Sequence, residues 1–494
     1  MFGSFEARLF LVVWVIYALH VVPGGGVNPN RYFDLTHSLV DQRSVTIDAY
    51  HENTIDKALK DGHYYSLGLP GPSIAAVPAY LSFKVVYRLL PDRLMKSLEQ
   101  VKSFKQGQHD GFYQKDNTAF FLSTLWITWF SLALISALSA VALFRVFLGL
   151  GVSGANALIA TSAYAFGTPV FFYSTTYFSA GFAASLVTLS LYLLMKLRSS
   201  ARTSTFFLLG LAAASSVLME YQALFLAGGV AIYVLLNWKL KAAWSFFLGA
   251  FVPCAVLLTY NTLAFGGPFH SAYEFVVGPN AQFHNVGALG FTLPRPERLF
   301  GLTLSAHRGL FVYSPALLLC FVGFVSTLRQ RKHQAHGVAL LSLVVAGAIW
   351  FWIASFQAWD GSSAFGPRLL VCILPLLAVG VGLSLSKVSR TIFIPLIALS
   401  VATNWLGAQY GFAENIWEPW RRFLTTGFTL PALTALATHS RVENPLSLFV
   451  ANWMWLITAI YALLMIGCFM LIFGPTLRLR TNLIAEKVLT ERRV

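Results

Sequence analysis

Residues 120–144, FFLSTLWITWFSLALISALSAVALF, form an uncharged stretch that decides the fold class of this chain. A helix needs roughly 20 predominantly apolar residues to cross the hydrocarbon core of a bilayer, and this stretch exceeds that length before Arg145 ends it. Other apolar runs that approach the same length begin near Leu9, Ala157, Gly181, Phe206, Gln222, Ala243, Gly309, Val338, Leu369, Thr391 and Asn452. The pattern predicts an all-α, polytopic membrane protein with about 12 transmembrane helices.

The composition of the whole chain leads to the same class. Of its 494 residues, 56% are hydrophobic and 11% are charged, whereas soluble domains carry roughly 25% charged residues. The four cysteines, Cys254, Cys320, Cys372 and Cys468, lie inside apolar runs and match neither a zinc site nor a disulfide framework. The sequence contains no evident repeat, low-complexity tract or soluble domain, so we interpret residues 1–494 as a single membrane domain.

The charges are distributed as in a protein with a defined membrane orientation. Lys and Arg number 35 against 20 Asp and Glu, which gives a net charge of +15. Basic residues near span ends are retained in the cytoplasm, and if the N-terminus is cytoplasmic, the alternate loops and the tail hold 16 of them beside only Glu486 and Glu491. They are Arg145; Lys196, Arg198 and Arg202; Lys239 and Lys241; Arg329, Arg331 and Lys332; Lys387 and Arg390; and Arg478, Arg480, Lys487, Arg492 and Arg493. The charge therefore predicts cytoplasmic N- and C-termini, and it gives no reason to expect a nucleic-acid partner.

The apolar stretch at residues 72–90 is interrupted by Pro78, Lys84 and Arg88. Counting it as a span would invert every later helix, so we expect a helix in the membrane interface, with its basic side chains reaching towards headgroups. The first outer loop then extends over residues 21–117. Further outer segments are expected at residues 264–307, 357–368 and 407–448.

The first outer loop combines two expected short helices, at residues 30–40 and 53–60, with a cluster of titratable side chains. The cluster consists of Asp48, His51, Glu52, Asp56, Asp61 and His63. One interpretation is a solvated loop in which the acids cap helices and Asp61-Gly62 forms a turn. The other is a functional site, flanked by aromatics that suit either a sugar or an interfacial belt: Tyr32, Phe33, Tyr64 and Tyr65.

Several short blocks between residues 28 and 370 resemble the GT-C superfamily of polytopic glycosyltransferases. The likeness is to bacterial relatives of the protein O-mannosyltransferases and of the lipid A aminoarabinose transferase. The blocks are Asn30-Arg31-Tyr32, Ile47-Asp48-x-Tyr50, Thr54-x-Asp56, Asp61-Gly-His-Tyr-Tyr-Ser66, Pro70-Gly71, Tyr260-Asn261, Phe265-Gly-Gly-Pro-Phe269, His307-Arg-Gly-Leu-Phe-Val-Tyr-Ser-Pro315 and Trp359-Asp-Gly-x-x-x-Phe-Gly-Pro-Arg368.

The resemblance implies a transferase in the bacterial inner membrane that uses a polyprenyl-phosphate sugar at the outer face, with an acid of the first outer loop as base. The acceptor would be a lipid, a glycan or a protein of the envelope. Two positions depart from the pattern. Asn28 stands where relatives with a D-E-x-R-Y motif have their acid, and residues 67–71, LGLPG, replace a D-K-x-P-G motif whose Lys suits a lipid phosphate. The base and the phosphate-binding cation must come from elsewhere, or the chain is inactive.

Three acids of the first outer loop are candidates for the base of an inverting displacement: Asp48 first, then Asp56 and Asp34. A carboxylate at the membrane interface would be more basic because it is partly desolvated. Asp61 and His63 are candidates to orient the acceptor, or to join the acids in holding a divalent cation. A solvated role remains open for both. Arg31 and Tyr65, in the matching blocks, are further candidates for binding substrate.

Arg308 and Arg368 are the candidates for binding the phosphate, because each is expected at the outer end of a span and a guanidinium can hold phosphate oxygens in a bidentate manner. His307 would add a third donor. Anchoring to ordinary headgroups is the alternative for both arginines. Glu220 divides the apolar segment 205–238, and we expect it in a wet turn between two helices rather than as a buried acid. Residues 265–298 are a candidate wall or lid.

The sequence therefore favours a glycosyltransferase that faces the outside and is surrounded by membrane lipids. A transporter or flippase of a lipid-linked sugar is the competing class, but transporters usually carry polar or broken positions at the midplane of several spans. Here the polar residues gather in outer loops. A GT-C relative that binds without turnover is the third interpretation, because of Asn28 and Gly68.

Overall fold

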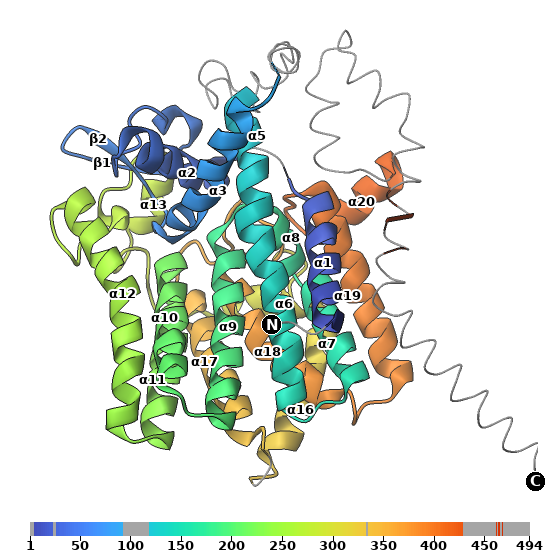
Figure 1. Ribbon diagram of the computed structural model, residues 1–494. Coiled ribbons are helices and arrows are strands. Elements are labelled where there is room, and N and C mark those ends of the chain that lie inside the picture. Colours follow the sequence, from blue (N-terminus) through green and yellow to red (C-terminus); the bar gives the residue numbers. More distant parts are fainter. Residues whose placement is uncertain are drawn as a thin grey trace, which may run out of the picture.

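The computed structural model describes residues 4–22, 26–91, 118–331 and 334–427, together with residues 461, 463, 464 and 467. Figure 1 shows a bundle of long helices with a smaller, separate group of elements at one end. We call that group the cap and define it as residues 26–91 and 266–290. Most of the predicted twelfth span, near Asn452, lies outside the described residues, as do residues 92–117 and 428–448 of the predicted outer loops.

The bundle confirms the prediction of an all-α fold. Its helices are α1 (Ser4–Leu19), α5 (Thr118–Ile127), η4 (Thr128–Ala133), α6 (Leu134–Gly149), α7 (Gly154–Gly167), α8 (Val170–Thr175), α9 (Ser179–Ser199), α10 (Thr203–Met219), α11 (Leu224–Asn237), α12 (Leu240–Phe265), α15 (Leu310–Tyr313), η8 (Pro315–Leu318), α16 (Leu319–Leu328), α17 (His336–Ala354), η9 (Arg368–Ile373), α18 (Leu374–Ser384) and α19 (Arg390–Tyr410). Within the described residues, five helical stretches are long and apolar enough to cross a membrane: Ala119–Gly149, Ser179–Ser199, Ala243–Phe265, His336–Ala354 and Arg390–Tyr410.

Small residues allow the bundle helices to approach each other closely, as is usual in membrane proteins. Gly210 of α10 lies against the carbonyl group of Phe246, and Gly249 of α12 lies against that of Phe207, so that neither position has space for a Cβ atom. Gly71, where the cap meets the bundle, lies equally close to the carbonyl oxygen of Leu218 at the end of α10. This contact brings the cap beside the turn that follows α10.

The cap begins with α2 (Val27–His37), which continues into η1 (Ser38–Gln42). The helix expected at residues 30–40 is therefore present, but it is not a surface helix. Asp34 and Leu35 are fully buried in it, since α2 packs against α3 (Gly71–Arg88) and η2 (His51–Asn53).

The prediction of a helix at residues 53–60 is wrong. This segment is strand β1 (Lys57–Lys60), which pairs antiparallel with β2 (His63–Ser66). Asp61 and Gly62 connect the strands with φ angles of 52° and 83°, the left-handed pair that a two-residue hairpin turn requires. The turn predicted at these residues is confirmed. It makes residues 57–60 pair across the hairpin instead of closing helical hydrogen bonds.

The stretch at residues 72–90 is a helix, α3, that passes through Pro78. Lys84 near its end is paired with Asp41 of η1 at 2.5 Å, and the hydroxyl of Tyr80 donates to the same carboxylate at 2.7 Å. This basic side chain is thus held by the cap itself. The interfacial position of α3 stays a prediction.

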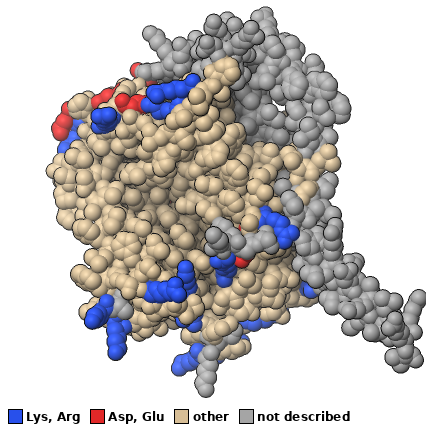
Figure 2. All heavy atoms as spheres, in the orientation of Figure 1, with Lys and Arg blue, Asp and Glu red and all other residues tan. Residues whose placement is uncertain are grey.

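Figure 2 shows that the charged side chains on this face of the molecule are distributed unevenly along the bundle. Lys and Arg gather at the end away from the cap, whereas the Asp and Glu side chains visible beside the cap are mixed with basic ones. This distribution agrees with the orientation expected from the loops. The cytoplasmic position of the termini remains a prediction.

Candidate functional site

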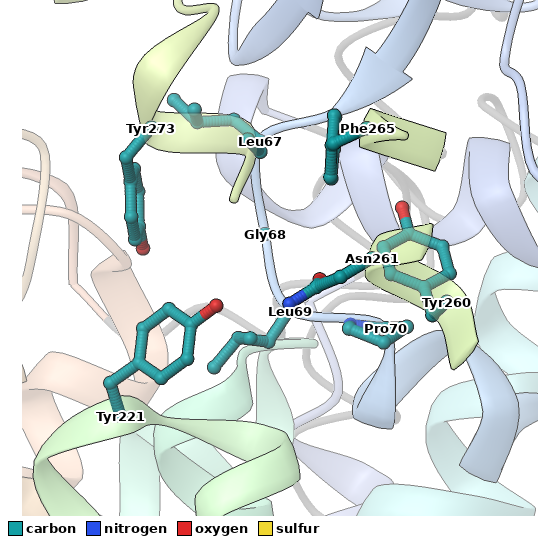
Figure 3. Close-up of a pocket in the computed structure, with 10 residues that line it drawn as sticks. Leu67, Gly68, Leu69, Pro70, Tyr221, Tyr260, Asn261, Phe265 and Tyr273 are labelled. Carbon is teal, nitrogen blue, oxygen red and sulfur yellow. The ribbon is translucent and has the colours of Figure 1, made fainter. Parts of the chain in front are cut away.

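A pocket opens where the cap meets the bundle (Figure 3). It is lined by Leu67, Gly68, Leu69, Pro70, Tyr221, Tyr260, Asn261, Phe265, Ala272 and Tyr273. The hydroxyl groups of Tyr221 and Tyr273 point towards the same space beside the backbone of residues 67–70. Aromatic rings with polar tips, set around an exposed turn of backbone, are suited to a sugar or to a polar headgroup.

Gly68 lies next to the side chain of Arg31, which is largely buried with 12% of its surface exposed. A Cβ atom at this position would be 2.5 Å from Cε1 of Tyr32 and 2.9 Å from Nε of Arg31. The position at which relatives carry a lysine therefore has no space for a side chain. The guanidinium of Arg31 lies there instead, although it comes from another part of the cap.

One hydrogen-bond donor of the Arg31 side chain has no partner. Its Nη1 donates to Oδ2 of Asp56 at 3.3 Å and its Nη2 donates to the hydroxyl of Tyr32 at 2.9 Å, while the buried Nε has no partner. Burial opposes the charge, but Tyr32, Asp56 and Tyr273 together hold the pKa of Arg31 above its usual value. The side chain is thus a permanent cation beside the pocket.

Asp56 joins Arg31 to the segment predicted as a wall. Its carboxylate is only 10% exposed, and the Nδ2 of Asn280 donates a short hydrogen bond to its Oδ1. Strand β1 also pairs with this segment, since the backbone N–H of Leu59 donates to the carbonyl of Phe275 at 2.9 Å. Residues 266–290 of the predicted wall therefore belong to the cap, which borders the pocket through Tyr273.

Glu220 is the residue that the sequence prediction undervalued. The expected turn between two helices is present, because Glu220 separates α10 from η5 (Tyr221–Ala223), but the turn is not wet: Glu220 is only 7% exposed. Its carboxylate accepts hydrogen bonds from Ser179 at 2.9 Å and Gln222 at 2.6 Å. An acid that interrupts an apolar segment was the available signal in the sequence.

The protonation of Glu220 is balanced near neutrality. Burial raises its pKa to about 7, although the hydrogen bond from Ser179 and the positive charges of Arg368 and Arg31 oppose the shift. A carboxyl group with such a pKa can take up and release a proton at physiological pH. Glu220 is not itself among the residues that line the pocket, but the next residue, Tyr221, is.

The three predicted bases lie in different surroundings. Asp48 is 40% exposed and accepts hydrogen bonds from Nδ1 of His63 and the backbone N–H of Tyr64, both at 2.7 Å. Partial burial raises its pKa, but these bonds outweigh it and lower the pKa below the usual value. Asp56 is paired with Arg31, and Asp34 is fully buried. Like Glu220 and Arg31, none of the three is among the residues that line the pocket.

The remaining residues of the predicted cluster lie on or beneath the hairpin. Asp61 is 83% exposed and lies 3.6 Å from the Nζ of Lys60. Tyr65 is buried against Phe265, with ring centroids 5.3 Å apart. Among the described residues, no group of three or more His, Cys, Asp or Glu side chains is arranged to hold a metal ion.

The hydrogen-bond donors of Arg308 are directed at backbone carbonyl oxygens around it. It is 2% exposed and donates to the carbonyl oxygens of Asp360 at 2.9 Å, Ser362 at 2.7 Å and Ala413 at 2.9 Å. Two further carbonyls, those of His307 and Glu414, lie within reach of its Nη1. The guanidinium therefore joins three chain segments and has little capacity left for a phosphate.

Arg368 and His307 both lie beside the loop that contains Asp360 and Gly361. The guanidinium of Arg368 lies over the ring of Phe178, 5.4 Å from its centroid. The Nε2 atom of His307 lies 3.5 Å from the carboxylate of Asp360, and its Nδ1 contacts the carbonyl oxygen of Glu414 at 2.6 Å. The positive charges of Arg368 and Arg31 both act on Glu220.

No family model and no curated protein matches this sequence. Among solved structures, the crystal structure of ArnT from Cupriavidus metallidurans bound to undecaprenyl phosphate is similar, with a TM-score of 0.50 and 17% sequence identity. The match covers 95% of this chain and 75% of ArnT. The chain has a GT-C fold. The resemblance that the sequence blocks indicate is thereby confirmed for the fold, and this GT-C-fold chain is a membrane protein.

Proposed function

We propose that this protein transfers a sugar from a polyprenyl-phosphate carrier to an envelope acceptor at the outer face of the bacterial inner membrane. The fold supports a lipid-linked substrate, since the similar ArnT structure contains undecaprenyl phosphate. The polar residues of the cap meet the apolar bundle at the pocket. There a lipid chain can stay in the bilayer while its headgroup reaches polar side chains.

The observation that carries the proposal is the position of Arg31 above Gly68. A glycosyltransferase of this kind needs a cation that stabilises the departing phosphate. The usual lysine position is Gly68 here, and the space above it is filled by the guanidinium of Arg31. We therefore assign the phosphate-binding role to Arg31, with its free Nε–H and its fixed charge.

In the proposed step, the acceptor hydroxyl attacks the anomeric carbon while the bond from that carbon to the phosphate oxygen breaks. The bonding electrons leave with the phosphate, which Arg31 neutralises. The acceptor proton passes to a carboxylate, and Glu220 is the best candidate because its pKa of about 7 suits a general base at neutral pH. One base suffices for this single displacement with inversion.

The same reasoning lowers the rank of Asp48 and Asp56. A base must accept a proton readily, whereas the pKa of Asp48 is lowered and its carboxylate is a weak base. The carboxylate of Asp56 is already engaged in an ion pair with Arg31. Asp56 is better suited to orient the guanidinium. Asp34 lies inside the cap, where its carboxylate accepts a hydrogen bond from Asn53.

The test is sugar transfer by the purified full-length protein in lipid, with a panel of polyprenyl-phosphate pentoses and hexoses as donors and envelope extract as acceptor. The variants are Glu220→Gln and Arg31→Gln, and Glu274→Gln is the matched control because Glu274 is also an acid near the pocket but is paired with His270. We expect turnover with at least one donor, and losses of about 100-fold or more for both variants.

The assay separates the proposed function from its competitors. Turnover that survives Glu220→Gln would keep the transferase and return the base to the acids of the cap. Binding of a donor without turnover would support the non-catalytic or transport interpretation. Failure to bind any polyprenyl-phosphate sugar would overturn the proposed function altogether.

A further inference from the structure

Three buried polar side chains converge inside the cap. Asn30 and Asp34 lie on the same face of α2, one turn apart, and Asn53 of η2 contacts both. The Nδ2 of Asn53 donates to Oδ1 of Asp34 at 3.0 Å, and the Nδ2 of Asn30 donates to the carbonyl oxygen of Asn53 at 2.8 Å. All three residues are at least nine-tenths buried.

Each of these side chains has an oxygen without a partner. The unpaired atoms are Oδ1 of Asn30, Oδ2 of Asp34 and Oδ1 of Asn53. Exchanging oxygen and nitrogen in the amide of Asn53 would set its oxygen against the carboxylate of Asp34, and doing so in Asn30 would set oxygen against a carbonyl. The two hydrogen bonds therefore fix the orientation of both amides.

With Asp34 ionised, every unpaired atom of the group is an acceptor, and the group has no donor left. The nearby ammonium of Lys57 contributes charge to Asp34, but it hydrogen-bonds to the carbonyl oxygen and the ring of His51. A buried carboxylate with a single hydrogen bond costs free energy unless a positive charge compensates it. A water has only two hydrogens for three oxygens, whereas a hard cation is coordinated by several oxygens at once.

We propose that Asn30, Asp34 and Asn53 hold a hard metal cation between α2 and η2, with Ca²⁺ as the best match. Calcium accepts carboxylate and amide carbonyl oxygens together and tolerates irregular geometry, whereas magnesium demands a near-ideal octahedron. The site contains a single carboxylate and no histidine or cysteine, which separates it from a zinc centre. Two of its ligands, Asn30 and Asp34, lie on either side of Arg31 in α2. The bound cation would therefore stiffen the helix that carries Arg31.

The experiment measures thermal unfolding and calorimetric binding with the full-length protein in detergent, after treatment with EDTA. Calcium or magnesium is then titrated at constant ionic strength. We expect calcium to raise the Tm saturably by about 2 °C or more, and magnesium to act more weakly. Asp34→Asn should weaken calcium binding by about tenfold or more. Asp61→Asn, an equal charge change at an exposed turn that tolerates Asn, should not.

A second variant keeps the test decisive if Asp34→Asn does not fold. Asn53→Asp sets a second carboxylate beside Asp34, so this protein should be less stable than the wild type in EDTA and should regain its Tm with calcium. The proposal is overturned if neither metal shifts the Tm of the wild type, or if the shift is unchanged in Asp34→Asn. It is also overturned if calcium fails to rescue Asn53→Asp, since the three oxygens would then be satisfied by water or by protonation of Asp34.

Discussion

Arg308 is a buried arginine and Arg31 is a largely buried one, and both lie in conspicuous sequence motifs, yet their surroundings differ. Arg308 donates to the carbonyl oxygens of Asp360, Ser362 and Ala413, so its guanidinium is used in holding the loop at residues 360–362 to the segment at residue 413. Arg31 has one carboxylate, one phenol and an unused Nε–H beside the pocket. We infer from this difference that an arginine can bind a ligand only when the fold leaves some of the arginine's hydrogen-bond donors unpaired.

The largest effect should come from Arg308→Ala. Removing this side chain leaves several buried carbonyl groups without donors, and the loss of a buried network of charged hydrogen bonds amounts to about 4 kcal/mol or more. We expect little folded protein in fluorescence-detected size-exclusion chromatography and a collapsed Tm. Arg295→Ala, at an exposed position, should change stability by less than about 0.5 kcal/mol. A folded Arg308→Ala protein that had lost only transfer would make Arg308 a phosphate ligand and erase the contrast with Arg31.

The pH profile of transfer sharpens the assignment of the base. Glu220 acts as a base only when ionised, and its pKa is raised from 4.5 to about 7. Transfer should therefore rise with pH and level off above about pH 7, with a loss of about tenfold between pH 8 and pH 6. Residual transfer by Glu220→Gln should lack this dependence, while Glu274→Gln should keep it. An unchanged profile in Glu220→Gln would remove Glu220 from the role.

Gly68→Ala tests whether Arg31 must occupy its observed place. The added Cβ would meet Cε1 of Tyr32 at 2.5 Å and Nε of Arg31 at 2.9 Å, so the guanidinium must shift. We expect transfer to fall by about tenfold or more, because small displacements of a catalytic group reduce the rate strongly. Gly154→Ala is the control, since a Cβ there meets nothing within 4 Å. Equal activity of both variants would argue against the role of Arg31.

The smallest effect is expected for Asp48→Asn. Its ion pair with His63 is solvent-exposed on both sides, and such pairs contribute less than about 1 kcal/mol. Because the fold lowers the pKa of Asp48, this small contribution is present at neutral pH and is lost only as the pH falls below the usual value for an aspartate. Transfer should stay within about threefold of the wild type. A loss near 100-fold would restore Asp48 as the base.

The sequence allowed the bundle to be predicted because the bilayer imposes a length and a composition on every span. It also predicted the turn at Asp61-Gly62, where the residue types themselves favour left-handed backbone. The segment at residues 53–60 was misjudged as a helix. Its state depends on pairing with β2 and with the loop near Phe275, and those partners are not visible in local periodicity.

The candidate site was only partly predictable for a related reason. The sequence placed Arg31, Asp56 and Glu220 among the notable residues, but their roles depend on what each one contacts. The sequence predicts a solvent-exposed Glu220. In the structure, the packing around Glu220 buries the side chain and raises its pKa. Arg308 and Arg368 had equal rank in the sequence, yet only the fold reveals that the donors of Arg308 are all directed at backbone carbonyls.

By itself, the sequence determined that the chain is an all-α membrane protein with its polar chemistry gathered in loops, since apolar length and charge position are properties of the chain alone. Which charged side chains keep unpaired donors or a shifted pKa depends on the tertiary structure. Desolvation and hydrogen bonding depend on neighbours that are distant in the sequence: Arg31 meets Gly68, and Ser179 and Gln222 meet Glu220. These contacts set the pKa values and the unpaired donors on which the proposed chemistry depends.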